Sequence, residues 1–338
     1  KSDTAKANLL IKLCEATIGS EPRKSESYAR QALNLSIQSN YLKGTASGYR
    51  YLGLSQYVQS QYGEAVDNWL KGAVIFDSIK DYSNLARLYS NIGAVYESQS
   101  DDIKALEFNL KSQKVAEQIG DTARIIAALG NIGAIYGKKS QTYSKALEID
   151  FRALELATAT HDINSQGTLS ANIGEIYFYQ QKDTMALRYF NKAYEAYLND
   201  GNESIPYALL NIGKVYYRMK DLRTAEKYQS QAVQYAEKIG AQRDLAGALN
   251  ALAETYFSKG EFSKSLNSLQ RAKDIGLEIK AYEELKVSYE GLAKNYFKTG
   301  DFKNAYSYQE KFSTIKDTIY NIGYTQKMEG LILNYEID

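Results

Sequence analysis

Apolar residues along this chain recur at helical spacing in long segments that short polar breaks separate. The breaks carry turn chemistry, as at Lys80-Asp81, Gly120-Asp121 and Gly300-Asp301. Two prolines and 23 glycines among 338 residues supply few turns for a many-stranded β protein. Ala, Leu, Lys, Glu and Gln are plentiful, so the sequence predicts an all-α protein.

The helical segments repeat. The string Asn-Ile-Gly-x-(Val/Ile)-Tyr occurs at residues 91–96, 131–136, 172–177 and 211–216. Including degenerate copies, one small residue recurs in steps of 39 to 41, at Gly53, Gly93, Gly133, Gly174, Gly213, Ala253 and Ala293. A second small residue follows each of them after 12 residues, or after 13 in the fourth unit. Small residues at fixed places let neighbouring helices approach closely, so each unit is predicted to be a helical hairpin in a solenoid.

Stepping back from Ala65 to Ser25 and Ala32 adds a weaker first unit, which makes eight. The predicted units are residues 1–40, 41–80, 81–120, 121–161, 162–200, 201–240, 241–280 and 281–320, in one solenoid domain over residues 1–320. Residues 321–338 form one more amphipathic segment, a capping or connecting helix, with Ile322, Met328, Leu331, Ile332 and Tyr335 on one side.

The pattern resembles the tetratricopeptide repeat, which has Leu-Gly and then Tyr on its first helix and Ala…Ala on its second. Those places hold Ile92-Gly93, Tyr96, Ala105 and Ser112 in the third unit and Ile212-Gly213, Tyr216, Ala225 and Ala232 in the sixth. The resemblance implies a right-handed α-α superhelix of about eight hairpins. The unit has 40 residues where the common form has 34, and the closing Pro is absent, so it is similar to the long-helix variety of cell-polarity adaptors and bacterial regulatory proteins.

Composition narrows the function. Lys plus Arg is 41 and Asp plus Glu is 40, a net charge of +1, whereas a protein that binds phosphates of nucleic acid is more basic. The longest nearly apolar stretch, residues 125–137, is too short to span a bilayer. A single cysteine, Cys14, excludes an internal disulfide. The compartment stays open between cytoplasm and periplasm, with tethering through a downstream membrane helix as a further option, and the oligomeric state stays open as well.

Catalytic chemistry is sparse. The one histidine, His161, lies in a predicted turn, and no second His or Cys accompanies it for a zinc site or a nucleophile pair. The string Gly137-Lys138-Lys139-Ser140 has Ile132 where a phosphate loop requires Gly. Carboxylate pairs fall at helix ends, as caps or solvated surface. We therefore expect no enzyme activity, no cofactor and no metal site.

The 30 tyrosines are predicted to belong mainly to the core. One repeat position is tyrosine in six units and should face the interior of each hairpin, at Tyr96, Tyr136, Tyr177, Tyr216, Tyr256 and Tyr296. These rings are therefore not expected to be a stacking platform for nucleic-acid bases.

Four asparagines form a candidate binding row. On a helical projection Asn91 lies about 150 degrees from the apolar stripe of its helix, facing solvent. The resemblance implies that first helices line a concave groove, so we define the asparagine row as Asn91, Asn131, Asn172 and Asn211. Amides donate and accept, so such a row can pair with the backbone of an extended peptide. The alternative is that Asn is merely the common residue of the repeat.

Specificity would come from variable groove positions beside the row. Those positions are Arg50, Tyr57, Arg87, Glu97, Lys138, Glu175, Phe178, Tyr179, Lys214, Tyr217, Arg218, Glu254, Phe257, Lys294, Phe297 and Lys298. Aromatic and Arg side chains suit interface anchors. The pairs Lys214/Arg218 and Lys294/Lys298 would receive an acidic residue or a terminal carboxylate, or else are solvated helix faces.

The predicted function is a non-catalytic scaffold that binds a protein or peptide in its groove. Two settings remain: the sensory or regulatory array of a larger bacterial signalling protein, with a histidine kinase, nucleotide cyclase or DNA-binding output, or a free-standing adaptor. The end at residues 331–336, without a Gly or Pro stop, resembles a cut before a continuing helix. A peptide or small-molecule receptor, which requires a closed pocket, is a further alternative.

Overall fold

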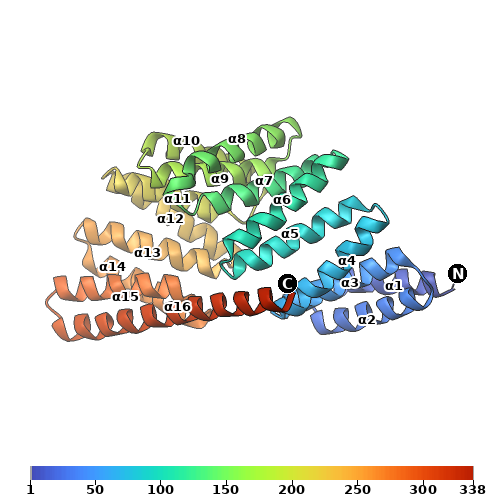
Figure 1. Cartoon of the computed structure of the whole chain (residues 1–338). Coiled ribbons are helices and arrows are strands. Elements are labelled where there is room, and N and C mark those ends of the chain that lie inside the picture. The colour runs from blue at the N-terminus through green and yellow to red at the C-terminus, as the bar shows by residue number, and fades with distance from the viewer. Residues whose placement is uncertain (1, 338) are drawn as a thin grey trace. The chain divides into compact units, whose positions relative to one another are not determined.

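The computed structural model describes residues 2–337, and side chains over residues 3–330. Within residues 2–337 the chain forms α-helices, one 3-10 turn and no strands, which confirms the all-α prediction (Figure 1). The helices follow one another along the chain as α1 (Ser2–Thr17), α2 (Pro22–Gln38), α3 (Leu42–Val58), α4 (Tyr62–Ser78), α5 (Tyr82–Ser98), α6 (Asp102–Ile119), α7 (Thr122–Tyr136), α8 (Tyr143–Ala159), α9 (Ile163–Tyr179), α10 (Asp183–Asp200), α11 (Ile205–Arg218), α12 (Leu222–Ile239), α13 (Gln242–Ser258), α14 (Phe262–Glu278), α15 (Tyr282–Lys298) and α16 (Phe302–Ile337). Each predicted repeat thus contains two helices; the handedness of the superhelix stays a prediction.

The chain divides into two compact units. Unit 1 comprises Lys1–Ile135 with Thr325–Asp338, and unit 2 comprises Tyr136–Tyr324. In each unit the two helices of a hairpin pack together, and the second helix then packs on the first helix of the next hairpin, as α4 does on α5 and α12 on α13. Each unit is described separately below.

Glycine and alanine at the repeat positions bring the helices of a hairpin together. A Cβ on Gly53 would stand 2.6 Å from the Trp69 ring and 2.9 Å from the Ala65 carbonyl oxygen. A Cβ on Gly174 would stand 2.8 Å from the Phe190 ring. The first helix thus accepts a large second-helix side chain because it has none of its own at that point.

The predicted interior tyrosines stack on an aromatic residue 12 positions later on the second helix. The ring centroids of these pairs lie 5.6 to 5.7 Å apart, for Tyr96 on Phe108, Tyr177 on Tyr189, Tyr216 on Tyr228 and Tyr296 on Tyr308. Stacked rings in a hairpin interior are core, which confirms the prediction for these four tyrosines.

Several helices are followed by a residue in the left-handed backbone conformation, which starts the turn. Gly120, Gly201 and Gly240 have positive φ after their helices, and His161 takes the same conformation at φ 56°, so it lies in a turn as predicted. Asp101 caps α6 by accepting a hydrogen bond from the Lys104 amide at 3.1 Å. The fourth unit's extra residue is absorbed by a 3-10 turn, Ser140–Thr142.

The last predicted element is part of α16. That helix runs from Phe302 to Ile337 without a break at residue 320, so residues 321–337 continue the second helix of the eighth hairpin. No proline interrupts this stretch, and Gly323 and Gly330 are accommodated inside the helix. Leu331, Ile332 and Tyr335 lie outside the described side chains, and a capping role for the segment stays a prediction.

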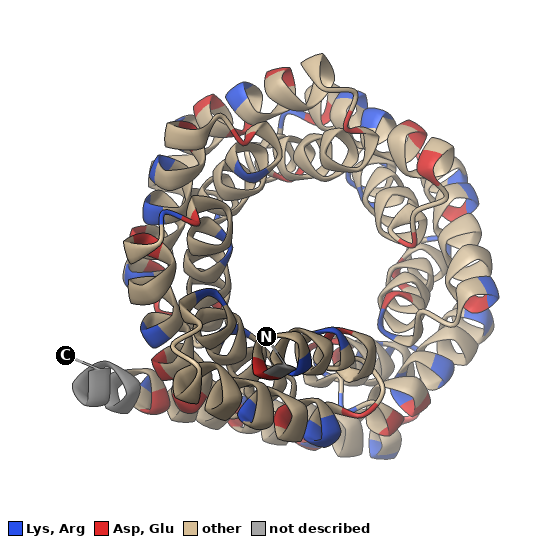
Figure 2. Cartoon of the chain, turned by 90° about the vertical axis from the view of Figure 1, so that its right-hand side faces the viewer, with Lys and Arg blue, Asp and Glu red and all other residues tan. Residues whose placement is uncertain are grey.

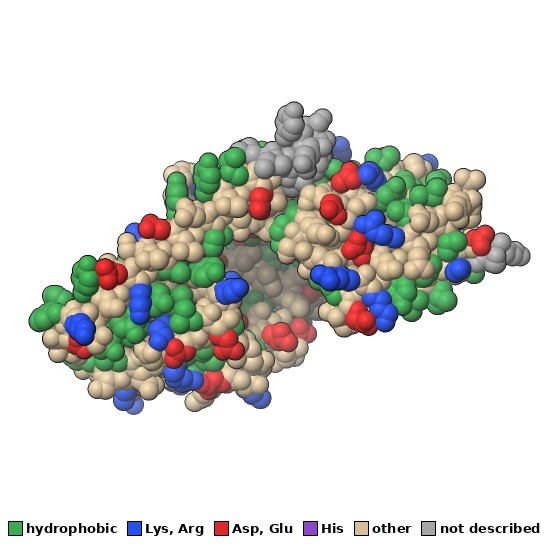
Figure 3. Space-filling view, turned by 90° about the horizontal axis from the view of Figure 1, so that it is seen from below, with side chains coloured by type: hydrophobic (Ala, Val, Ile, Leu, Met, Phe, Trp, Pro, Cys, Tyr) green, Lys and Arg blue, Asp and Glu red, His purple; other side chains and the backbone are tan. Residues whose placement is uncertain are grey.

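Figure 2 shows Lys and Arg interspersed with Asp and Glu over the helices. Figure 3 shows hydrophobic side chains on one face, dispersed among polar and charged ones. Single exposed apolar residues, such as Ile103 and Val74 on second helices, are ordinary for a folded chain.

Candidate ligand-binding pocket

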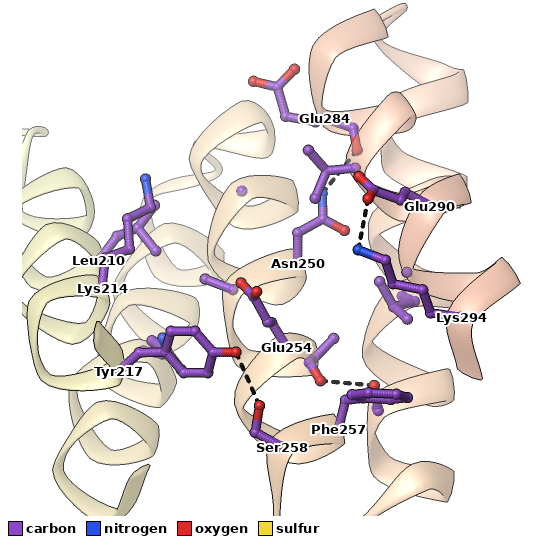
Figure 4. Close-up of a pocket in the computed structure, with 18 of the residues that line it drawn as sticks. Leu210, Lys214, Tyr217, Asn250, Glu254, Phe257, Ser258, Glu284, Glu290 and Lys294 are labelled. Atoms are coloured by element: carbon purple, nitrogen blue, oxygen red, sulfur yellow. Dashed lines mark hydrogen bonds and ion pairs between the residues drawn. The ribbon is translucent and has the colours of Figure 1, made fainter. Parts of the chain in front are cut away.

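A pocket of about 850 Å³ lies in unit 2 on the first helices of the last three hairpins. Helices α11, α13 and α15 supply most of its lining, and α13 packs directly against both of the others. Figure 4 shows Glu254 of α13 in the middle, between Tyr217 of α11 and Lys294 of α15. The volume falls in the range of about 300–1,000 Å³ that is usual for ligand sites.

Small residues create this space. The third to sixth units have asparagine two residues before the repeat glycine, whereas the seventh and eighth have Ala251 and Gly291 there. One turn earlier on α13 lies Gly247, where an added Cβ would meet only a Leu210 methyl carbon, at 3.7 Å. All three small residues line the pocket. Gly247 leaves open space on α13, whereas the Leu269 side chain fills the place of a Cβ on Gly291, only 2.6 Å from it.

Two buried asparagines fix the pocket wall. Asn250 Nδ2 donates to the Glu284 carbonyl oxygen at 2.9 Å, and Asn250 Oδ1 accepts from Ser288 Oγ at 2.8 Å. Asn295 Nδ2 donates to Ser265 Oγ at 3.0 Å, while its buried Oδ1 has no hydrogen-bond partner. These bonds join α13 to α15 and α15 to α14, which gives the pocket a preorganised polar wall.

Lys214 and Glu254 are the charged residues of the pocket that are most available to a ligand. Both side chains are exposed, and neither forms an ion pair within the described residues. Lys214 stands among protein atoms, and the partial loss of hydration lowers the pKa of its ammonium group, while the Glu175 and Glu254 carboxylates act in the opposite direction. Lys214 Nζ donates a long hydrogen bond, 3.5 Å, to Asn211 Oδ1.

Two further polar contacts frame these charges. The hydroxyls of Tyr217 and Ser258 lie 3.0 Å apart and link α11 to the end of α13 (Figure 4). Lys294 Nζ lies 2.6 Å from Glu290 Oε1, an i, i+4 pair in which both side chains are largely exposed. Exposed pairs of this kind contribute about 0–1 kcal/mol, so a ligand can replace this one.

The structure corrects the predicted Lys214/Arg218 pair. Arg218 lines the pocket, but its Nε donates to Asp183 Oδ1 at 2.8 Å and a terminal nitrogen donates to the Phe178 carbonyl oxygen at 2.6 Å. Its guanidinium also lies 3.8 Å from the centroid of the Phe178 ring. Arg218 therefore ties α11 to α9 and α10, and only Lys214 is left to meet an acidic ligand group.

Two other predicted residues of unit 2 lie outside the pocket lining. Lys298 is exposed at the end of α15, so the Lys294/Lys298 pair does not face the pocket together. Tyr179 is 60% exposed and stacks on Tyr143 of α8, with ring centroids 6.4 Å apart. Of the predicted groove positions, seven line the pocket: Phe178, Lys214, Tyr217, Arg218, Glu254, Phe257 and Lys294.

The asparagine row is divided between the two units and is unevenly exposed. Asn91 and Asn172 are half-buried, whereas Asn211 is buried and donates to the Tyr207 carbonyl oxygen of its own helix at 3.1 Å. Asn131 donates to Asn109 Oδ1 at 3.0 Å. The expectation that the whole row faces solvent is wrong at Asn211, which is only 7% exposed. Peptide binding by the row stays a prediction.

In unit 1 the structure gathers arginines. We define the arginine cluster as Arg50, Arg87 and Arg124, from three successive first helices, α3, α5 and α7. Partial burial lowers the pKa of the Arg50 guanidinium, and the positive charges of Arg87 and Arg124 act in the same direction. Arg50 donates to Asn84 Oδ1 at 3.0 Å, and Arg124 pairs with Asp121 at 2.9 Å.

Sequence reasoning missed the pocket itself and its wall residues Asn250 and Asn295. The sequence sign of a different surface in these two repeats is that Ala251 and Gly291 stand where the third to sixth repeats have asparagine. Among the described residues no cluster of three or more His, Cys, Asp or Glu side chains is suited to a metal ion. Within the same part of the chain, none of the helices combines the length and apolarity needed to cross a membrane.

Comparison with known proteins identifies the repeat. Residues 124–199 and 204–278 match the family described as Tetratricopeptide repeat, so these two segments carry tetratricopeptide repeats. Comparison with curated protein sequences gives no match.

Solved structures with this fold come from several regulators. The apo form of the quorum sensor NprR from B. thuringiensis is 16% identical, with a TM-score of 0.68 over 92% of this chain and 87% of that one. The Rap conjugation gene regulator of plasmid pLS20, in complex with the Phr* peptide, is 15% identical, with a TM-score of 0.61 over 94% and 97%. A signal transduction ATPase with a tetratricopeptide repeat sensor from Pyrococcus horikoshii is 17% identical, with a TM-score of 0.64 over 95% and 50%. At these identities the likeness establishes the fold.

Proposed function

We propose that this chain is a non-catalytic scaffold whose unit 2 binds a short extended peptide in the pocket between α11, α13 and α15. The observation that carries the proposal is the pocket of about 850 Å³, which Gly247 and Ala251 of α13 line with small side chains. Its lining mixes apolar surface from Leu210 and Phe257 with exposed charges, as peptide recognition requires.

The biological setting follows from analogy of fold. The similar structures include a quorum sensor, a peptide-bound gene regulator and an ATPase with a repeat sensor. We therefore propose that the chain is the sensory or regulatory region of a bacterial signalling protein. Sequencing the parent reading frame beyond residue 338 separates this from a free-standing adaptor, because only the former has an output domain.

Peptide binding can be tested by filling the pocket. Gly247→Leu places an isobutyl group where only Leu210 approaches, so the helix accommodates it while the side chain occupies the pocket. The probe is the tightest binder from a synthetic array of acetylated, amidated heptapeptides, titrated by fluorescence anisotropy. We expect Gly247→Leu to weaken binding at least about tenfold, or about 1.4 kcal/mol.

Gly323→Leu is the matched control. Gly323 also lies inside a helix, α16, with nothing within 4 Å of an added Cβ, and it is not part of the pocket lining. Both substitutions raise helix propensity by about the same amount, 0.8–1 kcal/mol. Equal affinity of the two variants for the array peptide would place the peptide elsewhere and overturn the proposal.

A further inference from the structure

The first helices of unit 2 carry charges of alternating sign at one repeat position. The residue directly after the repeat's small residue is Glu175, Lys214, Glu254 and Lys294 in four consecutive hairpins, and we call this the charge row. Three residues later the same helices carry an aromatic residue, at Phe178, Tyr217, Phe257 and Phe297. In unit 1 the second and third hairpins have Leu54 and Ala94 at the charge-row position.

The charge row is only partly neutralised by its own surroundings. At its ends, Glu175 accepts a hydrogen bond from the Tyr207 hydroxyl, and Lys294 pairs with Glu290. In the middle, Lys214 and Glu254 project from adjacent helices without forming an ion pair with each other (Figure 4). A cation and an anion side by side in a partly dehydrated pocket attract a ligand that offers the opposite charges.

The expected helix spacing favours one conformation of such a ligand. Helices α11 and α13 pack directly, and the axes of directly packed helices lie about 8–10 Å apart, so the backbones that carry Lys214 and Glu254 are offset by about that step. In a β-strand, side chains on one face repeat about every 6.6 Å, which is too short for this step. A polyproline II chain returns to the same face every three residues, about 9.3 Å, which matches it.

We infer that the pocket selects a peptide in polyproline II conformation that carries an acidic and a basic side chain three residues apart. The acidic group binds Lys214 and the basic group binds Glu254, while residues between them contact the apolar lining. This inference rests on the proposed peptide-binding function and adds the ligand's charge pattern and backbone conformation.

Five kinds of peptide probe test the charge pattern and its spacing. They are acetylated, amidated heptapeptides with Glu-x-x-Lys, Lys-x-x-Lys or Glu-x-x-Glu, where x is Leu or Pro, together with Glu and Lys placed two or four positions apart. For the wild-type protein we expect the mixed pair at spacing three to bind at least tenfold more tightly than every other probe. Equal binding at spacings of two, three and four would overturn the conformation.

Single charge reversals should redirect specificity. Lys214→Glu leaves two carboxylates in the pocket and should favour Lys-x-x-Lys, whereas Glu254→Lys should favour Glu-x-x-Glu, each by at least tenfold. Lys298→Glu is the matched control, because Lys298 is exposed on α15 outside the pocket lining and should leave the wild-type order intact. Circular dichroism melting of each variant verifies that the fold is retained.

The outcomes separate this inference from the function on which it rests. If Gly247→Leu abolishes peptide binding but charge reversal leaves the order of the probes unchanged, the pocket binds peptide and the charge pattern is overturned. If no array peptide binds, or if Gly247→Leu is without effect, both proposals fail. A further control is a peptide with free ends and neutral side chains. If it binds as tightly as Glu-x-x-Lys, the pocket recognises the peptide termini, and the three-residue spacing is overturned.

Discussion

Units 1 and 2 use the same hairpin but present different chemistry on their first helices. Unit 1 gathers three arginines of one sign, Arg50, Arg87 and Arg124, whereas unit 2 alternates signs along the charge row. The interior of both units follows one rule, with a small residue on the first helix facing a larger side chain on the second. The repeat therefore fixes the packing of the hairpin and leaves the ligand-facing positions free to diverge.

The two interiors also differ at one buried position of the second helix. This position holds Trp69 and Asn109 in unit 1, and Asp150, Phe190, Gln229 and Leu269 in unit 2. A large ring, an amide and a carboxyl thus occupy equivalent sites under similar burial. Substitutions at this position test whether the two units unfold independently of each other.

The largest expected effect comes from truncating the ring in unit 1. Trp69 is 1% exposed and its Nε1 donates to the Arg50 carbonyl oxygen at 3.0 Å. Trp69→Ala leaves a cavity and removes the hydrogen bond to the Arg50 carbonyl oxygen, so we expect a loss of about 3–5 kcal/mol in the free energy of unfolding. Because contacts in a solenoid are local, hydrogen exchange should accelerate over α3–α6 and remain slow over α9–α12.

Phe190→Ala is the matched change in unit 2. Phe190 is 1% exposed and packs against Gly174, so its truncation should cost a similar amount and accelerate exchange over α9–α12 instead. If either variant accelerates exchange equally in both sets of helices, the units unfold together and their separation in this comparison is wrong.

A smaller effect on the free energy of unfolding is expected from the buried carboxyl group of Asp150 in unit 2. Asp150 is fully buried, and neither of its oxygens has a hydrogen-bond partner. Burial raises the pKa of this carboxyl from 3.8 to about 8. Asn109, at the equivalent place in unit 1, instead donates to the Ala105 carbonyl oxygen at 2.8 Å and accepts from Asn131.

The sign of the pH effect follows from that raised pKa. Between pH 4 and pH 8 the folded chain keeps the Asp150 proton that the unfolded chain has released, so the free energy of unfolding falls as pH rises through this window. Asp150→Asn removes the titration, and we expect a gain of about 1–3 kcal/mol at pH 8. Urea unfolding of both proteins at pH 5 and pH 8 measures the difference.

The reverse substitution sharpens the comparison. Asn109→Asp transfers the buried carboxyl to unit 1 and should make that variant lose stability between pH 4 and pH 8 relative to wild type. If Asp150→Asn shows the same slope as wild type, Asp150 is ionised in the folded chain and the assigned burial effect is wrong.

Sequence periodicity was sufficient for the hairpins but not for the pocket. Packing imposes the same residue type at one place in repeat after repeat. The sequence therefore identifies the small residues Gly93 and Ala105 and the stacked Tyr96. The pocket lies beside the small residues Gly247 and Ala251, and a small residue in a sequence does not tell whether a neighbouring side chain fills the space it leaves, as Leu269 does at Gly291. Arg218 was misjudged because its partners Asp183 and Phe178 come from the preceding hairpin, 35 and 40 residues away.

The smallest expected effect concerns the arginine cluster of unit 1. Arg87 is exposed and forms no ion pair within the described residues, yet its charge acts on the partly buried Arg50. Arg87→Ala relieves this repulsion and should raise the free energy of unfolding by about 0.2–0.5 kcal/mol in dilute buffer. The Debye length shrinks from about 30 Å at 0.01 M salt to about 3 Å at 1 M, so the gain should vanish in 1 M NaCl.

Lys12→Ala, which removes an exposed lysine from α1 in the same unit, controls for the loss of a positive charge as such. A salt-dependent gain that is confined to Arg87→Ala would mean that unit 1 concentrates like charges at a stability cost. Such a cost would distinguish unit 1 from unit 2, whose charge row alternates in sign. If both variants respond equally to salt, the repulsion is spread over the surface and the two units differ only in the pocket.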